Sequence, residues 1–63
     1  MPVITLEIGP IESREMKAEL VQALTEAAVN VTKIPADKFT VLLKELDRDN
    51  IGISGKLLSD ILK

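Results

Sequence analysis

Histidine, cysteine, tryptophan and tyrosine are absent from this 63-residue sequence, and phenylalanine occurs once. These absences exclude disulfide bonds, thiolate nucleophiles, catalysis by Ser-His or Cys-His pairs, and zinc sites built from histidine and cysteine. Carboxylates, lysines, hydroxyls and a terminal amine remain as groups that could move a proton or attack a substrate. We therefore expect no metal site, and any catalysis must come from this short inventory.

The charge balance is mildly acidic, with 8 basic and 10 acidic residues and a net charge of -2. Nucleic-acid binding needs a basic face and usually stacking aromatics, so we expect no nucleic-acid partner. The sequence has no apolar run of the roughly 18 residues that a membrane span requires. It also lacks the basic and long apolar regions of a signal peptide. These features predict a cytoplasmic protein with no membrane partner.

Apolar residues make up 46% of the sequence, although a chain of this length buries only about 60% of its unfolded surface. Most of these residues are Ile, Leu, Val and Ala, which are typical of a packed core. Neither a disulfide nor a metal is available to stabilise so small a core. We therefore expect one domain, residues 1–63, that completes its core by assembling with other copies.

The first half of the sequence predicts a strand and a long helix. Apolar residues alternate with others over residues 3–8, which indicates a strand, and Gly9-Pro10 ends it. Ser13 then supplies a helix N-cap. Apolar residues recur every three or four positions after it, which predicts an amphipathic helix of about five turns. The expected apolar stripe comprises Met16, Leu20, Leu24, Ala27 or Ala28, and Val31.

The second half predicts another strand and a small hairpin. Residues 39–43 are apolar nearly throughout, as in a strand covered on both faces. The glycines within residues 51–55 indicate a hairpin, and Leu57, Leu58 and Ile61 form a short closing amphipathic segment. Strand, helix and strand make a βαβ unit with parallel strands. We therefore predict an α+β fold in which the helix covers one face of a two-stranded sheet and another subunit covers the other.

Pro2 is the most informative position for chemistry. Methionine aminopeptidases remove an initiator methionine that precedes a small residue such as proline, which would leave a secondary amine at the start of the strand. Burial disfavours the charged form of an amine and lowers its pKa, which suits a general base near neutral pH. Proline is also tolerated at the first position of a strand without any catalytic role, so position alone leaves both interpretations open.

The sequence resembles the 4-oxalocrotonate tautomerase family. The resemblance is carried by the length of the chain, the Met-Pro-Val-Ile start, Ser13 at the opening of the long helix, and the Asn- and Gly-rich residues 50–57. The resemblance covers essentially the whole chain. It implies a tautomerase-like fold in small subunits, usually assembled as hexamers from dimers. It also implies a cofactor-free, metal-free isomerase whose amino-terminal proline ketonises an enol or dienol 2-oxo acid such as 2-hydroxymuconate.

Three positions depart from the family's pattern of two arginines and one aromatic residue around the proline. Alignment to that pattern places Glu12 and Thr40 where the arginines are expected, and Ile51 where the aromatic residue is expected. Pro2 is therefore the only residue to which the resemblance assigns a catalytic role. Ile51 stays a candidate substrate-binding residue. Glu12 itself allows two interpretations, as a charge that favours the helix N-terminus or as a carboxylate that raises the pKa of the amine.

A carboxylate substrate needs a cationic partner, because a buried carboxylate without one is costly. Arg14 is our first candidate, since it lies two residues beyond Glu12 in the first helical turn. Lys44 is the second, since it follows Thr40 on the same strand face. The remaining candidates are Lys38, Arg48 and Lys56.

The sequence thus predicts a homohexameric tautomerase that acts on a small unsaturated oxo or hydroxy acid through Pro2. Two alternatives stay open because the expected arginines are missing. The chain could be a non-catalytic oligomeric module that kept the fold, or one subunit of a hetero-oligomer whose partner supplies the arginines.

Overall fold

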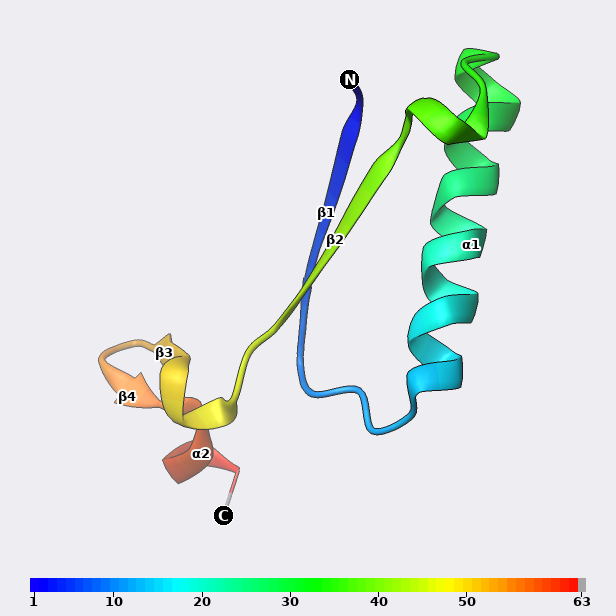
Figure 1. Ribbon diagram of the computed structural model, residues 1–63. Helices are drawn as coiled ribbons and strands as arrows, with labels where there is room; N and C mark the ends of the chain where they lie inside the picture. The colour runs from blue at the N-terminus through cyan, green and yellow to red at the C-terminus, as the bar shows by residue number, and fades with distance from the viewer. Residues whose placement is uncertain (63) are drawn as a thin grey trace.

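The computed structural model describes residues 1–62 of the chain. Its strands and α-helices are β1 (Val3–Ile8), α1 (Arg14–Thr32), β2 (Thr40–Glu45), β3 (Gly52–Ile53), β4 (Lys56–Leu57) and α2 (Leu58–Ile61). Two short 3-10 helices, η1 (Ala36–Lys38) and η2 (Arg48–Asn50), precede β2 and β3. Figure 1 shows β1 and β2 as a twisted pair, with α1 alongside and the C-terminal hairpin beyond the far end of β2. The predicted βαβ unit and hairpin are confirmed.

β1 and β2 are parallel and paired in register, beginning with Val3 beside Thr40. The side chains on one face of this pair are half-buried: Ile4, Leu6, Val41 and Leu43. On the other face Val3 and Leu42 are 49% and 44% exposed. The alternation along each strand therefore separates a face that packs toward α1 from a face that the same chain leaves open.

The sequence of α1 sets both of its ends. Its N-cap is Ser13, whose Oγ accepts a hydrogen bond from the Met16 N–H at 3.3 Å. At the other end Lys33 adopts a left-handed conformation, with φ of 63°, and its N–H donates to the Val29 carbonyl. The helix has 19 residues, which matches the predicted five turns at about 3.6 residues per turn.

Within a single chain, the middle of the predicted apolar stripe packs against the rest of the fold and its ends stay exposed. Leu20, Leu24 and Ala28 are half-buried, as expected. Met16 and Val31 are 59% and 83% exposed. Both lie in terminal turns of α1, beyond the part of the helix that packs on the sheet.

Two boundaries differ from the sequence-based expectation. β2 begins at Thr40 rather than at Phe39, which caps η1, and it continues through the polar residues as far as Glu45. Leu57 belongs to β4, paired with Gly52, rather than to the closing helix. The turn between β3 and β4 uses left-handed backbone at Ser54 and Gly55, with φ of 53° and 79°. Such positive φ values favour a tight hairpin turn.

A single chain leaves its core open. Over residues 1–62 no side chain is classed as fully buried, and the chain extends 43 × 24 × 15 Å. Large apolar side chains are exposed in β1, α1, β2 and the hairpin. This apolar surface is available for the predicted assembly with other copies. None of the helices within residues 1–62 is long and apolar enough to cross a membrane.

Candidate active site at the start of β1

Pro2 lies immediately before β1 and is half-buried. Its carbonyl oxygen accepts a hydrogen bond from the Thr40 N–H at 3.0 Å, so the start of β2 holds the backbone at this position. Met1 is 91% exposed, which leaves it accessible for removal. While Met1 is present, the Pro2 nitrogen belongs to an amide and is neither basic nor nucleophilic. Removal of Met1 creates a secondary amine at a fixed place beside β2.

Thr40 approaches this terminus through its side chain as well. The Thr40 hydroxyl donates to the Met1 sulfur, with an Oγ1 to Sδ distance of 3.5 Å. The backbone and the side chain of Thr40 therefore both face the first two residues. Sequence reasoning placed Thr40 where the family has an arginine but did not choose it as a site residue. The parallel pairing sets the start of β2, and with it Thr40, beside the start of β1.

The structure does not bring Arg14, Lys44 or Ile51 to Pro2 within one chain. Arg14 opens α1, which starts near the far end of β1 (Figure 1). Lys44 is paired with Glu7, four positions along β2 from Thr40. Ile51 caps η2, and its carbonyl accepts a hydrogen bond from Leu58 in the C-terminal segment. Any contact of these residues with a Pro2 amine must therefore be made between chains.

Two other cations of the same chain, Lys33 and Lys38, lie in the connection from α1 to β2. Lys33 caps the C-terminus of α1, and Lys38 ends η1 two residues before Thr40. Lys38 therefore lies at the end of the sheet where β1 and β2 begin.

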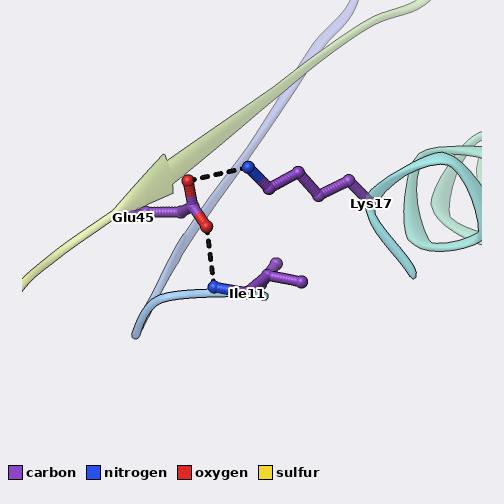
Figure 2. Close-up of polar contacts among 3 residues, drawn as sticks. All are labelled: Ile11, Lys17 and Glu45. Atoms are coloured by element: carbon purple, nitrogen blue, oxygen red, sulfur yellow. Dashed lines mark hydrogen bonds and ion pairs between the residues drawn. The ribbon is translucent and has the colours of Figure 1, made fainter. Parts of the chain in front are cut away.

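A second polar cluster lies at the opposite end of the sheet (Figure 2). Glu45 Oε1 accepts a hydrogen bond from the Ile11 N–H at 2.7 Å, and Oε2 pairs with Lys17 Nζ at 3.0 Å. The hydrogen bond from Ile11 is the main reason that the pKa of Glu45 is lowered, and the Lys17 ammonium lowers it further. Glu45 thereby attaches β2 to the loop that precedes α1 and to α1 itself.

This cluster holds the segment that carries Glu12 and Arg14. Glu12 lies in the loop just before the Ser13 N-cap, at the far end of β1 from Pro2. Within one chain this position favours its interpretation as a charge near the helix N-terminus. An open groove beside it is lined by Ile8, Ile11, Met16, Glu19, Leu20 and Ala23. That groove is apolar and lies away from Pro2.

The residues that the structure describes offer no metal centre, because no cluster of three or more histidine, cysteine or carboxylate side chains occurs among residues 1–62. Together, the fold and this site define a small βαβ subunit with a proline at the head of its first strand.

Comparison with known proteins identifies the family. A family model described as tautomerase enzyme matches residues 2–61. A probable tautomerase of Halalkalibacterium halodurans is 35% identical over 60 residues, covering 95% of this chain and 98% of that protein. The 2-hydroxymuconate tautomerase of Bacillus subtilis is 33% identical over 61 residues, covering 97% and 98%. The crystal structure of YwhB, a homologue of 4-oxalocrotonate tautomerase, has a TM-score of 0.85 at 32% identity, covering 94% and 97%.

The chain belongs to the tautomerase family, and the match of the family model begins at Pro2. The resemblance to the 4-oxalocrotonate tautomerases and the predicted tautomerase-like fold are both confirmed. The class of activity that the relatives support is that of a tautomerase, which is an isomerase.

Proposed function

We propose that this chain, as a single-domain subunit, ketonises the enol or dienol form of an unsaturated 2-oxo acid, with the Pro2 amine as general base after removal of Met1. The observation that carries the proposal is the placement of Pro2 at the head of β1, where its carbonyl accepts a hydrogen bond from the Thr40 N–H and where Met1 beside it is exposed. Similarity to a 2-hydroxymuconate tautomerase supports a substrate of that kind.

The proposed reaction moves one proton and consumes nothing else. The neutral amine accepts the proton of the enol hydroxyl, and the electrons of the O–H bond form the C=O double bond. The double bonds shift along the conjugated chain, and the ammonium returns the proton to the carbon at its end. Because proton and electrons are conserved, the cycle needs no oxidant, reductant or cofactor. A ring amine anchored by the backbone is already oriented for both transfers.

The cationic partners of the substrate carboxylate are proposed to come from more than one chain. Lys38 of the same chain is close to the start of β2, whereas Arg14 and Lys44 would act from neighbouring subunits. Ile51 of a neighbouring subunit would add an apolar contact with the substrate. A homohexamer built from dimers is the assembly we propose. It is supported by the exposed apolar side chains on the open face of the sheet, such as Val3 and Leu42.

The test compares three forms of the protein: processed wild type, processed Pro2→Ala, and a form that retains Met1 as verified by mass spectrometry. We expect wild type to ketonise 2-hydroxymuconate or phenylenolpyruvate, and both altered forms to lose about 100-fold or more in kcat/KM, the scale of general-base catalysis. The kcat/KM of wild type should rise with pH as the amine deprotonates. Sedimentation and circular dichroism establish that all three forms share one fold.

Activity that survives in both altered forms would remove Pro2 from the mechanism. An inactive but correctly assembled wild type would indicate a non-catalytic module. Recovery of a second chain at equal stoichiometry from the native host, together with activity of the mixture, would instead identify one subunit of a hetero-oligomeric tautomerase.

A further inference from the structure

Helix α1 has two apolar faces, and the chain itself covers only one of them. Leu24 and Ala28 are half-buried on the face that packs toward the sheet. The second face lies about a quarter of a turn further round the helix, and its first half lines the open apolar groove described above. Met16 and Val31, at its two ends, are 59% and 83% exposed. We call this surface the lateral face, and its residues are Met16, Leu20, Ala23, Ala27 and Val31.

The order of side chains along the lateral face is complementary to itself. The face runs from Met16 to Val31, so its midpoint lies beside Ala23. Two copies of α1 that pack antiparallel about this point set Leu20 of one against the partner's Ala27, a large side chain against a small one. Ala23 meets the partner's Ala23 at the two-fold axis, and so small a pair allows the helix axes to approach to about 8 Å. A two-fold interface requires such a surface, because the same residues serve both subunits.

The charges at the two ends of α1 favour the same antiparallel arrangement. Glu15 lies in the first turn, with Glu12 in the loop before it, and Lys33 caps the opposite end. Antiparallel copies set each acidic start beside the partner's Lys33, and opposite ends of the two helix dipoles then lie together. Parallel copies would instead bring like charges and like dipole ends together.

We propose that the lateral face of α1 binds the same face of a second copy of this chain, antiparallel and about a two-fold axis. The inference rests on the proposed function and deepens it, because it names the partner in the proposed dimers: another copy of this chain rather than a different chain. Pairing of this kind sets the start of α1, with Arg14, at the end of the partner where α1 leads into β2 and where Pro2 lies. Arg14, which is remote from Pro2 in its own chain, is thereby brought toward the Pro2 of its partner.

The chain contains no cysteine, so single cysteine variants can report on this pairing. Ala23→Cys places a thiol beside the two-fold axis, where the two Cα atoms come within the roughly 7 Å that a disulfide can span. Ala18→Cys is the matched control, because Ala18 is exposed on the opposite side of α1. Ala27→Cys tests the direction, since antiparallel packing separates its two thiols by about 10 Å along the helix axis, whereas parallel packing brings them together.

The experiment oxidises dilute samples of the three full-length variants and follows the covalent dimer on non-reducing gels. We expect Ala23→Cys to crosslink at least about 10-fold faster than Ala18→Cys and Ala27→Cys. Any other order of rates would overturn the inference, including the equal rates that random collision gives and an Ala27→Cys that crosslinks as fast as Ala23→Cys.

Sedimentation of Ala23→Glu and Ala18→Glu gives a second measure without oxidation. A carboxylate at position 23 would lie unpaired inside the interface, which should raise the dissociation constant of the assembly about 100-fold or more. Ala18→Glu should stay within about 3-fold of wild type. An Ala23→Glu protein that assembles like Ala18→Glu would overturn the inference, as would wild type that sediments as a single subunit, since its partner would then be a different chain. Neither method needs a substrate, so an inactive wild type that pairs through Ala23 would reject the proposed catalysis and leave this inference standing.

Discussion

The two carboxylate oxygens of Glu45 bind different segments of the chain, as Figure 2 shows. One oxygen holds the Ile11 N–H, and the other pairs with Lys17 on α1. The two charged side chains are 34% and 39% exposed, so solvent screens their attraction and the ion pair alone adds little stability. The backbone bond matters more for position, since it fixes the loop between β1 and α1 relative to β2.

The contacts of Glu45 predict an acid-sensitive contribution to stability. Its native pKa lies below the ordinary value of 4.5, mainly because of the Ile11 hydrogen bond. At a pH between the native and the unfolded pKa of Glu45, the unfolded chain binds more protons than the folded chain. The stability that Glu45 contributes is therefore complete above its unfolded pKa. It is lost as the pH falls through its native pKa. We expect the Tm of wild type to fall more steeply than that of Glu45→Gln when the pH is lowered from about 6 to 3.

The control for this measurement is Lys17→Gln, which removes the ion pair and leaves the hydrogen bond from Ile11 to Glu45 in place. Because that hydrogen bond is the main cause of the lowered pKa of Glu45, the Tm of Lys17→Gln should still fall more steeply than that of Glu45→Gln as the pH is lowered. If Glu45→Gln and wild type give parallel curves, the native contacts of Glu45 do not perturb its titration in solution.

At the scale of elements, the start of α1 depends on an N-cap, Ser13, that is recognisable from the neighbouring sequence alone. Ser13 Oγ accepts the Met16 N–H, which satisfies one of the donors that a helix leaves free at its start. Ser13→Ala should lower the free energy of unfolding by about 1 kcal/mol, the usual cost of losing such a cap. Ser13→Asp should restore most of it, because a carboxylate accepts the same bond and favours the helix N-terminus. Urea unfolding at fixed protein concentration measures both variants, and equal losses in the two would contradict a capping role.

Local signals account for the parts of the fold that the sequence predicted well. Alternation defines β1, and the Ser13 cap with its following apolar spacing defines α1, since each pattern lies within a few neighbouring residues. The end of β2 is different. Glu45 belongs to the strand through pairing with Ile8 and through contacts with Ile11 and Lys17, all of them distant in sequence.

The candidate site was predictable at Pro2 but less so around it. Pro2 was predicted because the amino-acid composition leaves few other groups that could act as a general base. The fold places Pro2 directly before a strand. Arg14 was chosen by closeness in sequence to Glu12. Because α1 returns antiparallel to β1 in the βαβ unit, its first residue lies near the far end of the strand from Pro2 (Figure 1). Which cations complete the site depends on contacts between copies, and these do not follow from patterns within one chain.

At the scale of the whole molecule, the chain carries the apolar content of a packed protein without enclosing it. Nearly half of its residues are apolar, yet over residues 1–62 none is classed as fully buried. The hydrophobic effect favours removing such surface from water, and two faces of the same chain are available for it. One is the open face of the sheet around Val3 and Leu42, and the other is the groove between Ile8 and Met16.

Folding and assembly should therefore be one process, and the open sheet face provides a direct test. Leu42 is 44% exposed near the middle of β2. If copies cover this face, Leu42→Glu places an unpaired carboxylate in the interface, which costs several kcal/mol. We expect the variant to sediment as a smaller species and to lose its folded state on dilution, with a Tm that depends strongly on protein concentration. Asn30→Glu adds the same charge at an exposed position of α1 and should sediment like wild type, whereas a Leu42→Glu protein of unchanged size and Tm would show that the assembly leaves this face open.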